Sequence, residues 1–363
     1  MTVLKNAKIL DSDFHFVEGA VQFQETIEAL GSSLSGSNER DLSGCYLIPG
    51  LVDIHTHGAV GVDAMDLELD FEKWKNYLLA NGVTTFFPTT VTASFEEIQQ
   101  ALERLKQADG VNMEGPFLSI GKKGAHDASK IREVDLGFMR EICDKIAITT
   151  IAPEVGGNLQ KIHDVTEMGV RVSLGHTSAD YALSCEAFHY GATEITHTFN
   201  AMNPLHHREP GLIGAAAERD SVFCEVISDG VHLHPSIVRM LYHMLGADRM
   251  VLISDSMAAT GFVDGIYHLG GLDVIVKDKK AHLEDGTIAG STNHLMQMVR
   301  CAVEFGIPLA EAVKMASLTP ARAVGISASV GSIETGKSAN LVVLDQNLQV
   351  KEVYYHGRLV SQL

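Results

Sequence analysis

The sequence predicts an α/β protein: a (β/α)8 TIM-like barrel with a small β-sandwich domain formed by both chain ends. Three observations support this fold class. Apolar strand-like segments alternate with helical patterns through the middle of the chain, these units number eight, and both ends of the chain are rich in β-type segments. The 363 residues, 45% of them hydrophobic, supply enough core for one large barrel or for two ordinary domains.

The N-terminal 48 residues predict short strands separated by turns, at 2–10, 15–23 and 26–30. The C-terminal segment returns to the same β pattern. Neither segment alone has enough apolar surface for a stable sheet, so we expect the two to pack together. The predicted division is a β-sandwich domain from residues 1–48 plus 325–363 and a (β/α)8 barrel from residues 49–324.

A barrel of this kind needs eight parallel strands, each followed by a helix. The apolar segments that fit strands are 50–55, 83–88, 110–114, 147–152, 170–175, 192–197, 222–228 and 250–254. The segments with apolar residues at spacings of three and four, which predict helices, are 70–81, 94–108, 135–144, 158–168, 178–189, 235–245, 290–305 and 309–316. A doubly wound sheet, the alternative, would carry a glycine-rich phosphate loop where this sequence has His-Thr-His-Gly.

Charge and cysteine usage restrict the partners and the compartment. The formal net charge of −18 argues against a nucleic acid or an anionic membrane as the main partner. The five cysteines are scattered and form no C-x-x-C pair, which favours reduced thiols over disulfides. The sequence shows neither a signal-peptide pattern nor an apolar run of the roughly 20 residues that span a bilayer. We therefore expect a cytoplasmic protein.

The first predicted barrel strand ends in two histidines spaced by one residue, His55 and His57. Side chains alternate along a strand, so both imidazoles project to the same side, toward the barrel mouth where such enzymes keep their chemistry. The spacing is short, and alone it is only a weak signal for a metal site.

Ionisable residues also close most of the other strands. Glu114 ends the third, His176 follows the fifth, His197 ends the sixth, His232 follows the seventh and Asp255 ends the eighth. A carboxylate at the end of an apolar strand needs a cation or hydrogen bonds to offset its burial. Imidazole and carboxylate without thiolate suit Zn, Fe, Mn or Co. Asp255 would then be the general base that deprotonates a water activated by the metal.

At this point the sequence resembles the amidohydrolase superfamily and, within it, the N-acetylglucosamine-6-phosphate deacetylase family. The segment PGLVDIHTHG at 49–58 is typical of the superfamily only, whereas MEGPF and THTFNAM are more specific to the deacetylase family. The segments that carry the resemblance are 49–58 (PGLVDIHTHG), 113–117 (MEGPF), 124–126 (GAH), 152–154 (APE), 175–177 (GHT), 196–202 (THTFNAM), 229–232 (DGVH), 254–257 (SDSM) and 289–291 (AGS).

The resemblance implies hydrolysis of N-acetyl-D-glucosamine 6-phosphate to D-glucosamine 6-phosphate and acetate, in amino-sugar catabolism and cell-wall sugar recycling. It also implies one or two divalent ions per subunit. Asp255 would act first as general base and then as general acid, and His126 would help to stabilise the oxyanion of the tetrahedral intermediate. The implied metal ligands are Glu114, His176, His197, His55, His57 and Asp255. The implied substrate contacts are Ala125, His126, Asn200, Ala201, Arg208, Asp229, His232, Ile288, Ala289 and Gly290.

Two basic segments stand out on this acidic chain. Arg208, in the loop at 205–209, could grip a phosphate through two parallel hydrogen bonds. It resembles a family arginine that reaches into the neighbouring subunit's site, which implies a homodimer. The glycine-flanked segment 121–126 could be a lid that brings His126 onto the scissile carbonyl.

Two alternative functions stay open. A different amidohydrolase, acting on a cyclic amide or on an amino sugar without phosphate, would keep the same ligands. A catalytically silent scaffold would keep only the fold, although the intact ligand set argues against it.

Overall fold

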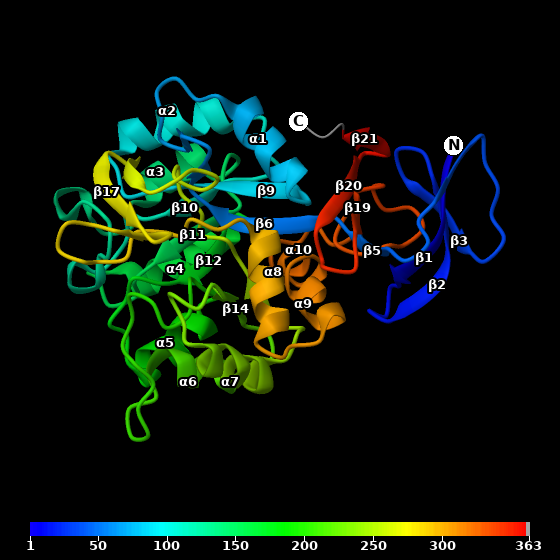
Figure 1. The fold of residues 1–363 in the computed structure, drawn as a ribbon. Helices are drawn as coiled ribbons and strands as arrows, with labels where there is room; N and C mark the ends of the chain where they lie inside the picture. Colours follow the sequence, from blue (N-terminus) through cyan, green and yellow to red (C-terminus); the bar gives the residue numbers. More distant parts are fainter. Residues whose placement is uncertain (361–363) are drawn as a thin grey trace.

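The computed structural model describes residues 1–360 and shows a barrel with a smaller β-domain at one side (Figure 1). The eight barrel strands run in the order β15-β14-β13-β12-β11-β10-β9-β6, with parallel pairing between neighbours. A parallel bridge between Thr56 and Ser256 joins the first strand to the segment after the last. The Asp255 N–H also donates to the His55 carbonyl at 2.9 Å. These contacts close the barrel and confirm the predicted fold class.

The barrel strands lie at the predicted positions, and most end earlier than predicted. Their bounds are β6 Leu51–Thr56, β9 Val83–Thr90, β10 Asn112–Glu114, β11 Ile148–Ile151, β12 Arg171–Leu174, β13 Glu194–Ile195, β14 Phe223–Val226 and β15 Met250–Leu252. β12, β13 and β15 stop early because His176, His197 and Asp255, two or three residues beyond their ends, have positive φ angles of 47°, 28° and 47°. Such angles are incompatible with extended strand backbone.

The predicted helices are present. They are α1 Phe71–Ala80, α2 Phe95–Leu105, α3 Leu136–Ile142, α4 Asn158–Glu167, α5 Tyr181–His189, α7 Pro235–Leu245, α8 Leu295–Glu304 and α9 Leu309–Met315. Ser94 and Glu97 form a capping box at the start of α2. The short helices α6 Gly211–Ala217 and α10 Leu318–Ala323 were not predicted, because both are buried on most sides and lack a polar face that would reveal helical periodicity. Two 3-10 turns, Ile120–Lys122 and Ala128–Lys130, follow β10.

The two chain ends combine into one β-domain, as predicted. Strand β5 (Tyr46–Pro49) pairs in parallel with β1 (Thr2–Leu10) on one side and antiparallel with β19 (Leu341–Leu344) on the other. In Figure 1 the blue N-terminal strands accordingly lie beside the red C-terminal ones. The remaining strands of this sheet are β2 Phe16–Phe23, β3 Ile27–Gly31, β4 Asn38–Asp41, β20 Val350–Tyr355 and β21 Arg358–Val360.

Leu47 of β5 is fully buried in the core of this domain together with Leu4 and Leu341, which come from opposite ends of the chain. The predicted β-sandwich from both chain ends is therefore confirmed. The division of the chain at residues 48/49 and 324/325 stays a prediction.

A small antiparallel sheet that was not predicted follows the last barrel strand. It contains β16 Gly265–Leu269, β17 Leu272–Lys277 and β18 Lys280–His282. Its apolar face packs with Val91 and Ala125 from the loops above the barrel. A second short hairpin joins β7 Gly58–Ala59 to β8 Val62–Asp63. Within residues 1–360, no helix is long and apolar enough to cross a membrane.

Candidate active site

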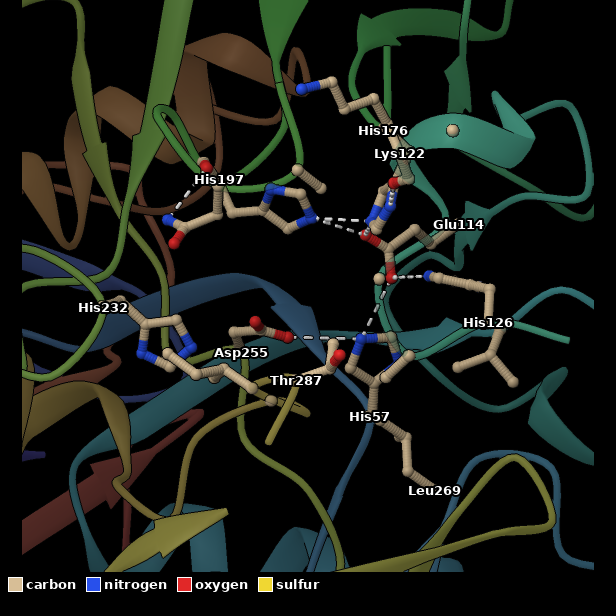
Figure 2. A pocket seen from close by; sticks show the side chains of 18 residues that line it. His57, Glu114, Lys122, His126, His176, His197, His232, Asp255, Leu269 and Thr287 are labelled. Atoms are coloured by element: carbon tan, nitrogen blue, oxygen red, sulfur yellow. Dashed lines mark hydrogen bonds and ion pairs between the residues drawn. The ribbon is translucent and has the colours of Figure 1, made fainter. Parts of the chain in front are cut away.

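A pocket of about 370 Å³ lies at the carboxyl ends of the barrel strands (Figure 2). Most of the side chains predicted for the site line it. These are His57, Glu114, Ala125, His126, His176, His197, Asn200, Ala201, His232, Asp255, Ile288 and Gly290. The residues predicted to converge from the ends of the barrel strands therefore do line one pocket.

Glu114 stands between two groups of imidazoles. Its Oε1 lies 3.0 Å from His197 Nε2 and 3.1 Å from His176 Nε2. Its Oε2 lies 3.2 Å from His57 Nε2 and 3.4 Å from His126 Nε2. The side chain is almost completely buried. One carboxylate thus faces both halves of the pocket, as the dashed lines in Figure 2 show.

The first group consists of Glu114, His176 and His197. The Nε2 atoms of His176 and His197 are 2.9 Å apart. His176 Nδ1 donates to the Lys122 carbonyl at 2.8 Å, which leaves its Nε2 as a bare lone pair. Around one tetrahedral zinc ion, nitrogen ligands bound at about 2.0–2.1 Å lie about 3.3 Å from one another. The spacing and the exposed lone pair therefore fit a divalent cation.

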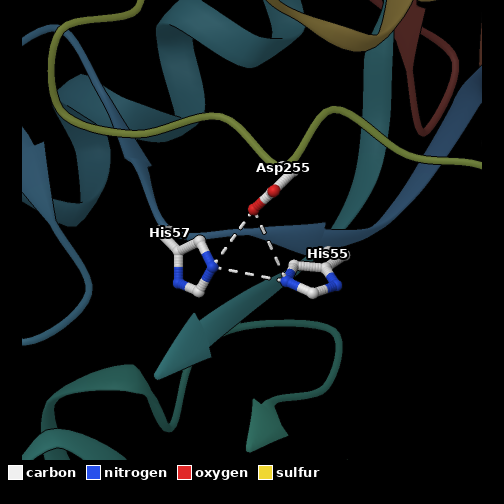
Figure 3. Close-up of side chains that lie close together, drawn as sticks. All are labelled: His55, His57 and Asp255. Carbon is white, nitrogen blue, oxygen red and sulfur yellow. Dashed lines mark hydrogen bonds and ion pairs between the residues drawn. The ribbon is translucent and has the colours of Figure 1, made fainter. Parts of the chain in front are cut away.

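The second group consists of His55, His57 and Asp255 (Figure 3). The two Nε2 atoms are 3.3 Å apart, and Asp255 Oδ1 lies 3.2 Å from that of His57 and 3.6 Å from that of His55. His55 Nδ1 donates to Glu225 Oε2 at 2.9 Å and His57 Nδ1 to the Thr89 carbonyl at 3.0 Å. Both rings therefore turn a bare Nε2 toward Asp255, and this group also fits a cation.

The electrostatics of the pocket favour positive charge between its carboxylates. Burial alone would lower the pKa of His57, but hydrogen bonds to Asp255 and Glu114 raise it to about 9. In the absence of a cation His57 Nε2 therefore carries a proton at neutral pH, and a metal ion that binds there takes the place of that proton. Burial would likewise raise the pKa of Asp255, yet the hydrogen bond to His57 and the charges of the histidines lower it to about 2. His176 differs, because burial and then the charge of His126 lower its pKa to about 4. A neutral His176 is the form that can bind a metal.

Three of these side chains start from unusual backbone. His176, His197 and Asp255 all have left-handed φ angles, which residues other than glycine rarely adopt. Neighbouring groups hold this backbone in place: the Ser119 N–H donates to the His176 carbonyl at 2.9 Å, and the His197 N–H donates to Glu225 at 3.1 Å. Strained backbone of this kind concentrates at functional sites.

His126 lies near enough to Glu114 and His176 to be counted as a third metal ligand. Its hydrogen bonding indicates otherwise. The Thr92 N–H donates to His126 Nδ1 at 3.1 Å, so in the neutral ring Nε2 must carry the proton. His126 therefore presents an N–H donor to the pocket rather than a lone pair, which is the form needed to stabilise an oxyanion.

Four other predicted residues do not line the pocket. His55 is fully buried beneath it, and Ala289 is buried in the core of the small sheet. Asp229 sits behind His232 and accepts its Nδ1–H at 2.9 Å. Arg208 lies in a separate hollow beside Tyr181, on a loop before α6 that projects from the barrel (Figure 1). The chain's own Arg208 therefore does not reach the pocket in this structure.

Four residues were missed by the sequence analysis. Val91, Leu269 and Thr287 line the pocket, and Glu225 holds His55 from below. Glu225 gave a usable signal, because it is a lone charge within an otherwise apolar strand. Val91 follows the second barrel strand and could have been found by its position. Leu269 and Thr287 depend on the unpredicted sheet, and no sequence pattern marks them.

Comparison with known proteins identifies the family. The sequence pattern of the Amidohydrolase family matches residues 46–360. The chain belongs to this family. An N-acetylgalactosamine-6-phosphate deacetylase of Escherichia coli O157:H7 is 37% identical over 339 residues, or 89% of each chain. An N-acetylglucosamine-6-phosphate deacetylase of Bacillus subtilis (strain 168) is 36% identical over 323 residues, which cover 84% of this chain and 82% of the relative.

A solved structure supports the same grouping. It is the N-acetyl-D-glucosamine-6-phosphate deacetylase of Mycobacterium smegmatis, a variant in complex with N-acetyl-D-glucosamine-6-phosphate. The TM-score is 0.94 at 35% identity, and 99% of each chain is covered. The resemblance predicted from the motifs is confirmed. With the two ligand groups, family membership makes this amidohydrolase a hydrolase that uses a divalent metal.

The proton positions predict different outcomes for two neighbouring histidines. His176→Asn should remove the ion held by the first group from the purified protein, because loss of a ligand weakens metal affinity by more than the roughly 10–100-fold that follows loss of a ligand's hydrogen-bond partner. His126→Asn should leave the metal content unchanged, because His126 offers no lone pair. Metal per chain, measured by plasma emission spectrometry after chelator-free purification, checks both. Equal loss in the two variants would make His126 a ligand.

Proposed function

We propose that the chain hydrolyses N-acetyl-D-glucosamine 6-phosphate to D-glucosamine 6-phosphate and acetate, in amino-sugar catabolism and cell-wall sugar recycling. The observation that carries the proposal is one pocket in which Glu114 joins two ligand groups beside the Asp255 carboxylate and the His126 imidazole N–H. The relatives named as deacetylases of amino-sugar 6-phosphates support this substrate class. The free state of all five cysteines supports the predicted cytoplasmic location.

In this proposal Glu114, His176 and His197 hold the principal metal ion. His55, His57 and Asp255 form a second site, so that one or two ions bind per subunit. We propose Zn or Fe, with Mn and Co as alternatives that the same ligands accept. When bound, a divalent ion polarises the amide carbonyl and lowers the pKa of water toward neutrality.

Asp255 and His126 would assist different steps of the hydrolysis, the first by proton transfer and the second by a hydrogen bond. Asp255 accepts a proton from the attacking water as the oxygen bonds to the carbonyl carbon. His126 donates its Nε2–H to the oxygen that gains negative charge in the tetrahedral intermediate. Asp255 then returns the proton to the nitrogen while the C–N bond breaks, because an amine anion is too poor a leaving group to depart unprotonated. Water and amide thereby give the amine and acetic acid, and transfer of the acid's proton to the more basic amine leaves acetate and an ammonium group.

The rest of the pocket would hold the sugar. His232 faces the pocket with its Nδ1–H fixed by Asp229, so its Nε2 can accept a hydrogen bond from a sugar hydroxyl. Asn200, Ala201 and the Ile288–Gly290 loop form the surrounding wall, with Ala289 behind it. Ala125 lies beside His126 and places apolar surface next to the amide.

Lysine and arginine side chains give the pocket of one chain little positive charge for a phosphate. Among the described residues that line the pocket, Lys122 is the one lysine or arginine, and its Nζ already donates to the Met202 carbonyl at 3.2 Å. We propose that Arg208 of the partner subunit meets the phosphate in a homodimer. The position of Arg208 on a projecting loop, outside the pocket of its own chain, supports this arrangement.

A substrate panel tests the proposed function. The purified holoenzyme should release acetate from N-acetyl-D-glucosamine 6-phosphate with a kcat/KM at least roughly 100-fold above that for the unphosphorylated sugar, because hydrogen bonds to charged groups contribute about 1.5–3 kcal/mol each. Equal rates would favour a different amidohydrolase, and no hydrolysis by fully metallated protein would favour a silent scaffold. If N-acetyl-D-galactosamine 6-phosphate is hydrolysed faster than N-acetyl-D-glucosamine 6-phosphate, the chain would instead have the activity after which the Escherichia coli relative is named.

Removal of the proposed base should stop the chemical step. Asp255→Asn keeps the size of the side chain but cannot accept the proton, so kcat should fall by about 10²–10⁴-fold. Acetate release is measured together with metal content, because Asp255 also belongs to a ligand group. A variant that holds the parental metal content and keeps the parental kcat would contradict the mechanism.

The role of Arg208 across the interface can be tested by complementation. Arg208→Ala should lower kcat/KM by roughly 100-fold, because the charge-assisted hydrogen bonds to the phosphate are lost. Arg208→Lys should have a kcat/KM between those of the parent and the alanine variant, because lysine keeps the charge but cannot form two parallel hydrogen bonds. Co-expression of Arg208→Ala with Asp255→Asn subunits should restore about a quarter of parental activity, since about half of the dimers are mixed and each contains one complete site. Activity no higher than the sum of the separate variants would place Arg208 in its own chain's site.

A further inference from the structure

Glu225 is a buried carboxylate that belongs to neither ligand group. It lies on β14, and no described residue of that strand lines the pocket. Its exposed fraction is 1%, so its charge is removed from water directly beneath the site. Burial of an ionised carboxylate is costly unless hydrogen bonds or charges compensate it. The contacts of Glu225 therefore indicate what its burial accomplishes.

One oxygen of Glu225 reaches both ligand groups. Its Oε2 accepts from His55 Nδ1 at 2.9 Å and from the backbone N–H of His197 at 3.1 Å. The backbone carbonyl of Glu225 accepts a hydrogen bond from the Thr198 N–H at 2.8 Å. His55 belongs to the second group and His197 to the first. Glu225 is thus a direct link between the two groups on the side away from the pocket, while Glu114 links them within it.

These bonds fix features that ligation requires. The bond to His55 determines which ring nitrogen carries the proton and so turns a bare Nε2 toward Asp255. The bond to His197 restrains a residue whose φ of 28° lies outside the regions that most residues occupy. His57 and His176 are held instead by the neutral carbonyls of Thr89 and Lys122. A carboxylate partner makes a bound imidazole a stronger electron donor than a carbonyl does.

The other oxygen of Glu225 argues against a purely structural role. Glu225 Oε1 is buried and has no hydrogen-bond partner in the described chain. A side chain that served packing alone would be more stable as an apolar group, because a buried unpaired oxygen costs about 1–3 kcal/mol. The arrangement thus satisfies only the oxygen that faces the two histidines.

We propose that Glu225 is the positioning residue that holds both ligand groups in register, so that loss of its carboxylate weakens metal binding in both. This inference rests on the metal-binding part of the proposed function and not on the identity of the sugar. A narrower possibility is that Glu225 only balances the charge of His55. In that case its loss would affect the His55 group and leave the His176 and His197 group intact.

The test compares Glu225 with a matched residue, Glu194. Glu194 is fully buried on the neighbouring strand β13, and neither of its carboxylate oxygens has a hydrogen-bond partner in the described chain. Glu225→Leu removes both bonds to the histidines. Glu225→Gln keeps an oxygen that can accept them but loses the charge. Glu194→Leu and Glu194→Gln remove a carboxylate from the same layer without touching a ligand.

Zinc is the probe, and its affinity is measured by competition with a chromophoric chelator after reconstitution of metal-free full-length protein. Glu225→Leu should weaken binding of every ion that the parent binds by about 10–100-fold, and Glu225→Gln should weaken it by a smaller factor. The Glu194 variants should keep parental affinity. Circular dichroism and the thermal midpoint of the metal-free protein separate lost ligation from lost folding, because a merely structural role would lower the midpoint and spare the affinity.

Parental affinity in folded Glu225→Leu would overturn the proposal, as would loss of only one of two bound ions. If the leucine variant does not fold, parental affinity in Glu225→Gln overturns it instead. Equal losses in the Glu194 variants would also do so, since the effect would then belong to the buried layer in general. A parent that binds zinc without cleaving the amino sugar would refute the proposed function alone, whereas a parent that binds no zinc would refute both.

Discussion

One buried carboxylate, that of Glu114, lies at the centre of the contacts in the pocket. Its two oxygens face different groups of imidazoles, and the side chain is 2% exposed. Burial would raise its pKa, but the charge of His55 and then the hydrogen bond from His126 lower it well below the usual range. An ionised group in this position requires positive charge around it. A barrel can place several histidines around this carboxylate, because the ends of all eight strands converge on one mouth.

The proton positions then divide the histidines by function. Four rings surround Glu114 closely, and distance alone does not separate ligands from donors. The partner of Nδ1 does so for three of them. Carbonyl oxygens accept from His57 and His176 and so expose lone pairs, whereas a backbone N–H bonds to His126 and leaves it an N–H. The carbonyl that fixes His176 belongs to Lys122, within the segment predicted to be a lid, so that segment also orients a proposed metal ligand. Its motion stays a prediction.

The sequence predicts the fold and most of the pocket because both follow from local patterns. Apolar strands of regular spacing define the barrel, and an ionisable residue at a strand end, such as Asp255, is visible in the chain itself. Proton positions are not visible, because they depend on partners distant in sequence: His126 and Thr92 are 34 residues apart. Leu269 also could not be predicted, since its place in the pocket requires the folding of β16 and β17. Glu225 carried a signal of the same kind as Glu114, but it lies inside a strand rather than at its end.

The acidic character of the chain and a phosphorylated substrate are compatible for a physical reason. The net charge of −18 is spread over the whole molecule, and exposed charges beyond the Debye length of about 8 Å at physiological ionic strength are largely screened. What matters for a phosphate is therefore the set of cations within a few ångströms of it. Lys122 already bonds to a carbonyl, and Arg208 lies in a hollow of its own. The pocket of one chain thus holds the groups proposed for amide hydrolysis but, among the described residues, only one lysine for a phosphate, so the proposed phosphosugar recognition would gain positive charge from a surface beyond it.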